Sequence, residues 1–376
     1  MVKDNRIDIL DSYRFIAILS VMLYHYYSRW TPPINNVSLY PYGSKYDHFS
    51  YGNLGVQFFF IISGFVIAFT LTRTDSFIDF WKKRIIRLLP SMFICSFITL
   101  VVFRLMDTKM LFLGSHSIKN FIFSLSFLSP EIYHRIIPFS NLKVNYINGS
   151  YWSLWPEIQF YFVASSFYFI NKKNFILNIS IFTILIIFLN YLTLRVLDNV
   201  QTTNRLGLNI SNQTIESYKF WITDIFNYVS YSIYFILGVL FFQLHSKENK
   251  RMSIILLCIC LFILLISNGG FNFTQFLPIH LVFIMFLLFV GFIYFPKQLN
   301  FVTMNPISNI GVASYSLYLI HEVIGVLLIN KYADVFGKYD YVFPIFVILL
   351  MICFALLSFK YIEKPIGLYL KKKLIH

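Results

Sequence analysis

Long apolar runs separated by short polar segments dominate the pattern of this chain. An α-helix needs about 20 mostly apolar residues to cross a bilayer, so each long run predicts a transmembrane helix. The stretch 119–129 is apolar but too short to span, and we expect it at the membrane interface or as a re-entrant piece. The pattern predicts an all-α polytopic membrane protein, a bundle of about ten transmembrane helices over 8–27, 53–72, 89–105, 151–170, 174–194, 222–243, 252–267, 275–295, 308–330 and 341–362.

Basic residues mark one side of this predicted bundle. With a cytoplasmic N-terminus, most of the 31 lysine and arginine residues fall in cytoplasmic segments, as the positive-inside rule requires. Counting 119–129 as an eleventh span would move Lys172, Lys173 and the C-terminal lysines to the outside, and we reject that topology. We therefore expect both termini to be cytoplasmic.

Composition excludes the other broad classes. Hydrophobic residues make up 57% of the chain and charged residues 13%, whereas a soluble domain has about 25% charged residues. The apolar content is also far too high for a disordered chain. The net charge of +14 is spread between the apolar runs, so it indicates membrane topology and no nucleic-acid partner. We expect one transmembrane domain over 1–376, with no signal peptide and no appended soluble domain.

Two short patterns give little chemistry. The four cysteines lie inside apolar runs, and their spacing indicates neither a disulfide framework nor a metal site, so we expect no metal. Asn148-Gly149-Ser150 fits a glycosylation acceptor, although so short a pattern also recurs by chance.

The ionisable residues of the first predicted span include Asp11, Arg14 and His25. Charges inside a span are costly and are functional candidates by default. Arg14 and His25 lie about three turns apart, on one helix face and roughly 16 Å from each other. Asp11 precedes Arg14 by one turn and can pair with it. A structural ion pair beside an interfacial histidine is the alternative interpretation.

Two further spans carry ionisable residues near the same depth. Glu157 is the only charged residue of 151–170. His321 shares a helix face with Ser314 and Tyr318. The predicted topology places His25, Glu157 and His321 in the outer half of the bilayer, and Arg14 near its inner third. For Glu157 and His321, burial with a hydrogen-bonded partner remains the structural alternative.

Arg84 and Arg87 follow a lysine pair on the predicted cytoplasmic side. A spacing of three residues puts both guanidinium groups on one helix face, an arrangement that suits bidentate binding of phosphate. Contact with lipid head groups or simple positive-inside flanking is the alternative.

These residues lie within a set of motifs that resembles a known family. The chain is similar to the membrane-bound acyltransferase family 3, which includes bacterial O-antigen and exopolysaccharide O-acetyltransferases. The resemblance covers nearly the whole chain through six elements in the family's order: Arg14 and His25 in the first span, the run Gly55–Phe65, the pair Arg84 and Arg87 with Pro90, the segment Tyr151–Phe160, the segment Ser314–His321, and Ile362–Pro365.

The resemblance implies transfer of an acyl group, most often acetyl, from cytoplasmic acetyl-CoA to a carbohydrate hydroxyl. We favour the O-antigen of lipopolysaccharide as acceptor, in the bacterial cytoplasmic (inner) membrane. Succinyl as the acyl group, or another exopolysaccharide, a glucan or peptidoglycan as acceptor, are alternatives within this class. A proton-coupled transporter is the alternative from another class, although such proteins often show repeats or paired broken helices that are not seen here.

Roles for the candidate residues follow from the resemblance and from residue chemistry. Arg84 and Arg87 hold the phosphates of acetyl-CoA, and His25 acts as general base on the acceptor hydroxyl. Arg14, positioned by Asp11, binds the donor or steadies charge on the thioester oxygen. An acyl-histidine intermediate stays open. The remaining candidates are Glu157 to orient the imidazole or the sugar, His321 as a second proton-transfer group, and Trp152, Tyr318 and Ser314 as acceptor contacts.

Two positions depart from the family pattern. Pro156 stands immediately before Glu157, where we expect it to kink the start of the helix. Glu322 follows His321, where many members carry a tryptophan, so the match at His321 is weaker.

Overall fold

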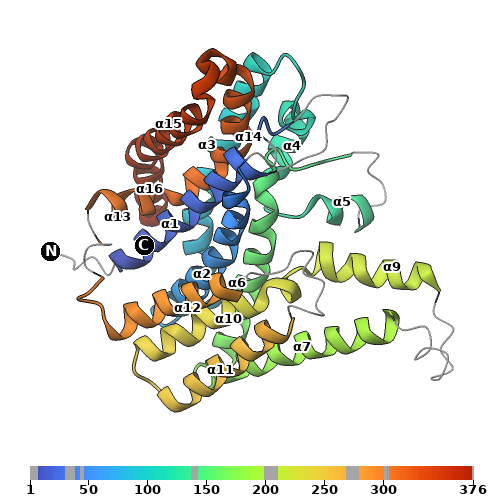
Figure 1. Cartoon of the computed structure of the whole chain (residues 1–376). Helices are drawn as coiled ribbons and strands as arrows, with labels where there is room; N and C mark the ends of the chain where they lie inside the picture. Colours follow the sequence, from blue (N-terminus) through green and yellow to red (C-terminus); the bar gives the residue numbers. More distant parts are fainter. Residues whose placement is uncertain are drawn as a thin grey trace. The chain divides into compact units, whose positions relative to one another are not determined.

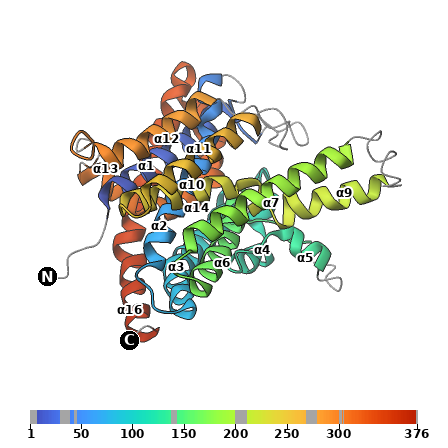
Figure 2. The same ribbon diagram turned by 90° about the horizontal axis from the view of Figure 1, so that it is seen from below.

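The computed structural model describes residues 7–29, 39–42, 46–136, 143–198, 211–267, 279–299, 303 and 305–374. The described residues form helices, helical turns and connections, with no strand among them (Figures 1 and 2). This confirms the predicted all-helical class.

The described chain divides into two compact units. The first unit contains the parts of 1–59, 78–153 and 296–376 that are described, and the second contains those of 60–77 and 154–295. The helix α2 (Gly55–Leu71) begins in the first unit and continues into the second, and α3 (Phe77–Met106) belongs almost wholly to the first.

The first unit is built around α1 and α14. It also contains η2 (Asp47–Leu54), η3 (Leu113–His116), α4 (Ile118–Ser124), α5 (Pro130–Ile136), η4 (Gly149–Ser153), α13 (Asn305–Val312), η7 (Ala333–Val342), α15 (Phe343–Ser358), η8 (Phe359–Glu363) and α16 (Lys364–Leu374). The helix α1 (Asp8–Leu23) packs against α13, and α14 (Ser314–Tyr332) packs against α1 and α15.

A glycine allows α1 and α13 to approach closely. A Cβ atom at Gly311 would lie 1.8 Å from the carbonyl oxygen of Asp11, so no larger residue fits there without moving a backbone. This contact fixes the helix that carries Asp11, Arg14 and His25.

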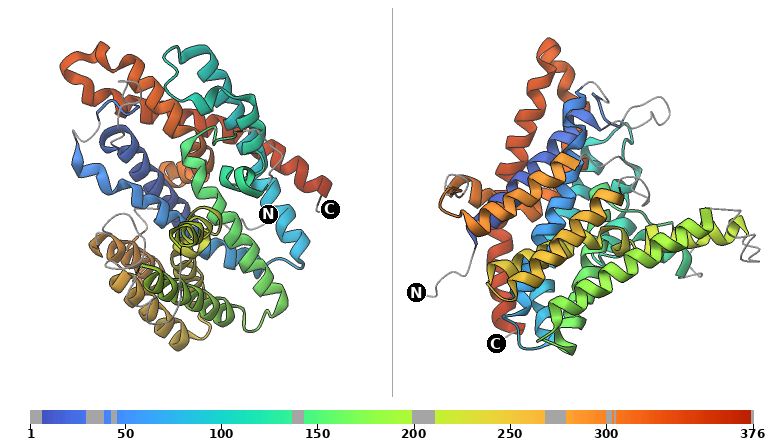
Figure 3. Two further views of the ribbon diagram at one scale, coloured as in Figure 1. Left: turned by 90° about the vertical axis from the view of Figure 1, so that its right-hand side faces the viewer. Right: turned by 60° about the horizontal axis from the view of Figure 1, so that its bottom comes forward.

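The second unit is built around α10 (Tyr228–His245). This helix packs against α6 (Leu154–Ile170), α7 (Phe175–Asp198), α11 (Lys250–Ser267) and α12 (Ile279–Tyr294), which surround it in Figure 3. Most of its residues are buried, since it is apolar on all faces. The helix α9 (Asn212–Phe220) and the π-helical turn η5 (Trp221–Ile225) lead into it.

Several helices are long and apolar enough to cross a membrane. Within the described ranges five qualify: Asp47–Leu71, Phe77–Met106, Phe175–Leu197, Asn212–His245 and Phe343–Leu374. A sixth qualifies if the bent pair Pro306–Val312 and Ser314–Gly337 is one span. The chain is therefore a multi-pass membrane protein by helix length and composition, and fewer helices than the predicted ten meet this test.

One detail differs from the sequence predictions. The predicted span 308–330 is not one straight helix, because the chain bends by 75° between α13 and α14. Pro156, where a kink is expected, lies in the first turn of α6, which begins at Leu154. A proline in the first turn costs little, since its missing N–H would have had no intrahelical partner there. The stretch 119–129 holds only the seven-residue helix α4, in accord with its exclusion as a span.

Candidate functional site

His25 lies in a π-helical turn, η1 (Tyr24–Ser28), which directly continues α1. Single π-helical turns within α-helices occur frequently at functional sites. The hydroxyl of Tyr26, in the same turn, donates to the carbonyl oxygen of His321 at 2.7 Å. The turn is thereby held against α14, and His25 is buried there.

The two candidate histidines lie next to each other. The ring centroids of His25 and His321 are 5.2 Å apart, with the rings edge to face. Nδ1 of His321 lies 2.8 Å from the carbonyl oxygen of Tyr318, which can only accept, so Nδ1 carries the proton. Nε2 of His321 has no hydrogen-bond partner among the described residues. The structure thus brings together two residues that are 296 positions apart in sequence.

A buried carboxylate, that of Glu322, lies beside this histidine pair. Its Oε1 accepts hydrogen bonds from Nη1 of Arg29 and from the hydroxyl of Tyr40, both at 2.7 Å. The same oxygen lies 3.5 Å from Nδ1 of His25. Arg29 also stacks over the ring of Tyr40, with the guanidinium carbon 4.9 Å from the ring centroid.

Arg29 contacts both Glu322 and His25. Its Nη1 lies 3.2 Å from Nδ1 of His25. A guanidinium can only donate, so this contact fits a neutral imidazole that carries its proton on Nε2. Nδ1 of His25 therefore lies between a donor, Arg29, and an acceptor, Glu322.

The environment of Glu322 keeps the neighbouring hydroxyl of Tyr40 protonated and leaves space for the carboxylate. Burial, and then the negative charge of Glu322, raise the pKa of Tyr40 well above its usual value, so its hydroxyl remains a donor. A Cβ atom at Gly149 would lie only 3.0 Å from Oε2 of Glu322. The absence of a side chain at Gly149 therefore makes space for the carboxylate.

The turn η4 provides further polar contacts to α14. The hydroxyl of Tyr318 donates to the carbonyl oxygen of Ser150 at 2.9 Å and lies 2.7 Å from Oγ of Ser153. Asn148 is fully buried and donates to the carbonyl oxygen of Leu319. This burial is incompatible with a glycosylated side chain in the folded protein, so the acceptor motif at Asn148 is a chance match.

Two other acceptor-contact candidates lie in the same unit. Trp152 is half-buried in η4, and Ser314 is buried at the first turn of α14. Tyr318, the third, has its ring centroid 5.4 Å from that of His321.

Asp11 and Arg14 form the ion pair that their spacing predicts. Nη1 of Arg14 lies 2.5 Å from Oδ1 of Asp11, and both side chains are largely buried on α1. The pair lies about three turns before His25, which follows α1 in the turn η1.

Glu157 belongs to the second unit. The hydroxyls of Ser63 on α2 and Tyr161 on α6 donate to its Oε1 at 2.5 and 2.6 Å. These contacts correspond to the alternative considered from the sequence, a carboxyl group hydrogen-bonded to another helix.

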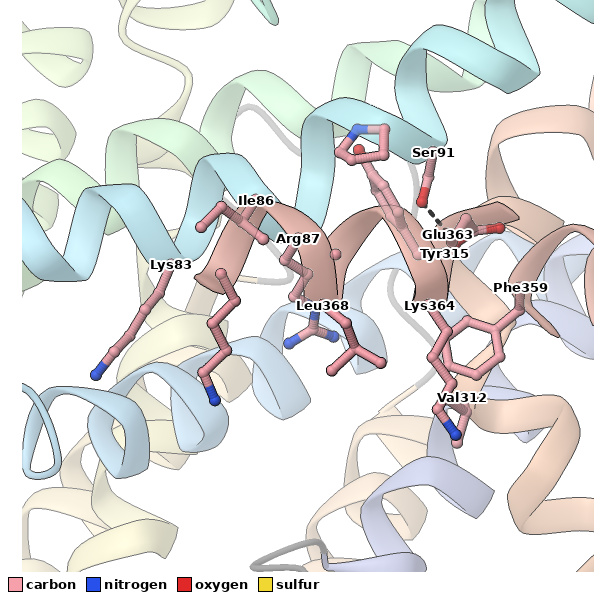
Figure 4. Close-up of a pocket in the computed structure, with 13 residues that line it drawn as sticks. Lys83, Ile86, Arg87, Ser91, Val312, Tyr315, Phe359, Glu363, Lys364 and Leu368 are labelled. Carbon is pink, nitrogen blue, oxygen red and sulfur yellow. Dashed lines mark hydrogen bonds between the residues drawn. The ribbon is translucent and has the colours of Figure 1, made fainter. Parts of the chain in front are cut away.

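A separate pocket of about 400 Å³ lies between α3 and the C-terminal helices of the first unit. Figure 4 shows Lys83 and Arg87 extending from α3 on one side of it, and Ser91 facing Glu363. Its volume falls within the range of small-molecule sites. Four cationic side chains line it: Lys83, Arg87, Lys364 and Lys371.

Glu363 is held in this pocket by hydroxyl groups. Ser91 donates to its Oε2 at 2.6 Å, Ser358 donates to its Oε1 at 2.9 Å, and Ser316 makes a short hydrogen bond to the same oxygen. Glu363 is the last residue of the π-helical turn η8. Among the described contacts, its carboxylate makes no direct ion pair with the four cations that line the pocket.

The predicted arginine pair is split between two environments. Arg87 is exposed and lines the pocket, whereas Arg84 is buried, with its guanidinium carbon 5.5 Å from the ring centroid of Phe80. The pocket therefore presents Arg87 with three lysines, in place of the expected pair of Arg84 and Arg87.

The amino-acid sequence matches the model of a known family. The model of a family described as an acyltransferase domain matches residues 7–361, nearly the whole chain. The chain belongs to this acyltransferase family. The resemblance found in its motifs is thereby confirmed.

Relatives within the acyltransferase family carry related names. The chain is 31% identical over 175 residues to a protein of Shigella phage Sf6 named O-acetyl transferase, covering 46% of this chain and 50% of that protein. It is 25% identical over 397 residues to O-acetyltransferase OatA of Staphylococcus aureus, covering 95% of this chain and 56% of OatA. The chain thus spans about half the length of these relatives. No solved structure matches it.

Glu322, Arg29 and Tyr40 are not among the candidates from the sequence. Glu322 lies in a predicted span, next to His321, as a departure from the acyltransferase pattern, and Arg29 and Tyr40 fall in a predicted loop. The one available signal was the placement of a carboxylate next to a histidine inside an apolar span. Within the described ranges, no group of three or more histidine, cysteine, aspartate or glutamate side chains is placed to hold a metal ion.

Proposed function

We propose that this protein transfers an acetyl group from acetyl-CoA to a hydroxyl of a cell-surface carbohydrate, with the O-antigen of lipopolysaccharide as the favoured acceptor. The observation that carries the proposal is the buried contact of His25 with His321, Arg29 and Glu322. Membership of the acyltransferase family and the names of its relatives support acetyl as the group transferred.

The cationic pocket suits the donor. Acetyl-CoA carries phosphate groups, and lysine and arginine side chains recognise phosphate through charge-assisted hydrogen bonds. Arg87, Lys83, Lys364 and Lys371 supply four such groups around one cavity. In this proposal they hold the phosphates, and Arg84 supports Arg87 from the buried side of the same helix.

His25 is the proposed general base of the transfer. The acceptor hydroxyl oxygen attacks the thioester carbonyl carbon, so that a C–O bond forms and the C–S bond breaks. His25 takes the hydroxyl proton and returns it to the departing sulfur, which leaves an O-acetyl ester and free coenzyme A. His321 serves as the second proton-transfer group.

The remaining candidates take supporting roles. Arg14, oriented by its 2.5 Å contact with Asp11, steadies the donor or the charge that develops on the thioester oxygen. Trp152, Tyr318 and Ser314 contact the acceptor. The proposed task of Glu157 is to orient the sugar.

Membrane topology completes the proposal. Each of the ten predicted ranges is mostly helical where it is described, which supports ten crossings in the bacterial inner membrane with both termini cytoplasmic. We propose that 1–376 acts as one transmembrane acyltransferase domain.

Membrane vesicles of known orientation test this function. Radiolabelled acetyl-CoA is supplied at the cytoplasmic face and polysaccharide at the opposite face, and alkali-labile label on the polysaccharide is measured by mass spectrometry and counting. Label on the polysaccharide that depends on the protein is the expected result. Transfer only when donor and acceptor share one face would overturn the arrangement across the membrane, and no transfer in any arrangement would overturn the activity.

A further inference from the structure

Glu322 is the most deeply buried acidic side chain in the neighbourhood of His25, and the proposed function gives it no task. Its residue is 2% exposed, and three groups converge on Oε1: Arg29, Tyr40 and, at 3.5 Å, Nδ1 of His25. Oε2 has no hydrogen-bond partner among the described residues. A carboxylate held in this way is costly to bury, so its position calls for a physical reason.

Charge balance accounts for part of its position. Arg29 compensates the negative charge through a 2.7 Å hydrogen bond, and its own side chain is 35% exposed. Tyr40 adds a second donor to the same oxygen. Two donors therefore compensate the carboxylate close to His25.

The position of Glu322 also affects which ring nitrogen of His25 carries the proton. In the geometry observed, Arg29 donates to Nδ1, which places the imidazole proton on Nε2. An imidazole whose Nε2 acts as a base must instead carry a proton on Nδ1, and that proton needs an acceptor. Oε1 of Glu322, 3.5 Å from Nδ1, is the nearest carboxylate oxygen that can take this part.

We propose that Glu322 is a positioning residue for His25: its carboxylate accepts a hydrogen bond from Nδ1–H and so leaves the lone pair of Nε2 as the base. This inference rests on the proposed acetyl transfer. During the transfer, His25 gains the hydroxyl proton on Nε2 and becomes an imidazolium, which the carboxylate stabilises. The proton then passes from Nε2 to the departing sulfur, and Glu322 itself stays ionised.

The same contacts assign Arg29 a place in the cycle. While Arg29 donates to Nδ1, His25 cannot act as a base through Nε2, so this geometry is a resting one. When Nδ1 is protonated, Arg29 keeps its bond to Glu322 and no longer donates to the ring. This change is a tautomer shift in which Nε2 loses a proton and Nδ1 gains one, so the imidazole stays neutral and the number of charges is unchanged.

Three variants test the positioning role. Glu322→Gln removes the charge, Glu322→Asp keeps it but withdraws the carboxylate from Nδ1, and the double variant Glu322→Gln/Arg29→Gln restores charge balance without a carboxylate. Each is purified in detergent, its yield of monodisperse protein is compared with wild type, and kcat and the KM for acetyl-CoA are measured separately. Glu248→Gln, at an exposed position between α10 and α11, is the matched control.

We expect kcat to fall about 10²-fold in Glu322→Gln and in the double variant, since general-base catalysis contributes roughly 10²- to 10⁴-fold. The KM for acetyl-CoA should stay near the wild-type value. A low yield of Glu322→Gln should be repaired in the double variant, because removing one partner of a buried ion pair is more damaging than removing both. Glu322→Asp should fold normally and lose activity.

The outcomes separate a positioning role from a structural one. A double variant or Glu322→Asp with the wild-type kcat would overturn the proposal, and would make Glu322 only the counter-ion of Arg29. If wild type itself transfers no acetyl group, the proposed function fails and the positioning role fails with it. If wild type transfers acetyl groups and the variants keep the wild-type kcat, the proposed function stands and only the positioning role fails.

Discussion

Two regions of the first unit differ in how their charges are arranged. Around His25 the charges are few and balanced, with the buried Glu322 facing the partly exposed Arg29 at 2.7 Å. In the pocket between α3 and α16 the charges are open to the surroundings, and four cations share the cavity with one carboxylate, Glu363. The first arrangement suits the movement of a proton, and the second suits the capture of an anion.

The difference has a physical basis. In a buried site electrostatic interactions are strong and geometry decides which nitrogen holds a proton. In an open pocket they are screened, so several cations are needed to hold an anionic ligand. If this division is correct, changes around His25 lower kcat and changes in the pocket raise the KM for the donor.

The largest expected effect is the loss of His25. His25→Ala should lower kcat by about 10²- to 10⁴-fold, because a general base is removed from the transition state. The measurement is alkali-labile O-acetyl on purified polysaccharide, at equal abundance of the two proteins. His245→Ala, at the exposed end of α10, is the matched histidine control and should retain activity.

Substitution in the pocket should produce the next largest effect, and in a different constant. Arg87→Ala should raise the KM for acetyl-CoA about 10-fold with little change in kcat, since a hydrogen bond between charged groups contributes about 1.5 kcal/mol or more. Lys82→Ala on the same helix is the control, because Lys82 does not line the pocket. If Arg87→Ala lowered kcat and left the KM for acetyl-CoA unchanged, the two regions would not have separate effects on kcat and KM.

Tyr40→Phe should have a smaller effect on the buried region. The variant removes one of two donors to Oε1 of Glu322 and leaves Arg29 in place, so we expect a fall of about 5-fold in kcat. Because the pKa of Tyr40 is raised by burial and by Glu322, its hydroxyl stays protonated from about pH 6 to about pH 8. The ratio of wild-type to variant kcat should therefore be flat over that range, and a ratio that varies with pH would show that Tyr40 itself titrates.

Local features of the molecule could be predicted from the sequence. The all-helical class and the pairing of Asp11 with Arg14 depend on neighbours within one helix, so apolar length and a spacing of one turn are sufficient. The contact of His25 with His321 was anticipated only as a shared depth in the bilayer. The structure shows that the two rings are neighbours, with their centroids 5.2 Å apart.

The rest depends on contacts that no local pattern records. Arg29 and Tyr40 reach Glu322 across almost 300 residues, and they do so from a segment with no apolar periodicity. Likewise, Arg84 and Arg87 share a helix, but which of them is buried depends on the helices packed against α3. The sequence does not indicate the proposed role of Glu322 for the same reason. In the sequence, Glu322 is only a departure from the family motif, next to His321.

The smallest expected effect tests how closely Glu322 must be placed. In Gly149→Ala the new Cβ would lie 3.0 Å from Oε2, so the carboxylate has to move by a few tenths of an ångström. A misplacement of about 1 Å can cost about 10²-fold in rate, and a shift of this size should lower kcat about 3-fold at unchanged KM. If the effect passes through Glu322, Gly149→Ala should cause no further loss in a Glu322→Gln background, because the two changes act on one contact. Additive losses would instead mean that Gly149 acts on the rest of η4, and that the buried region tolerates more movement than its short contacts indicate.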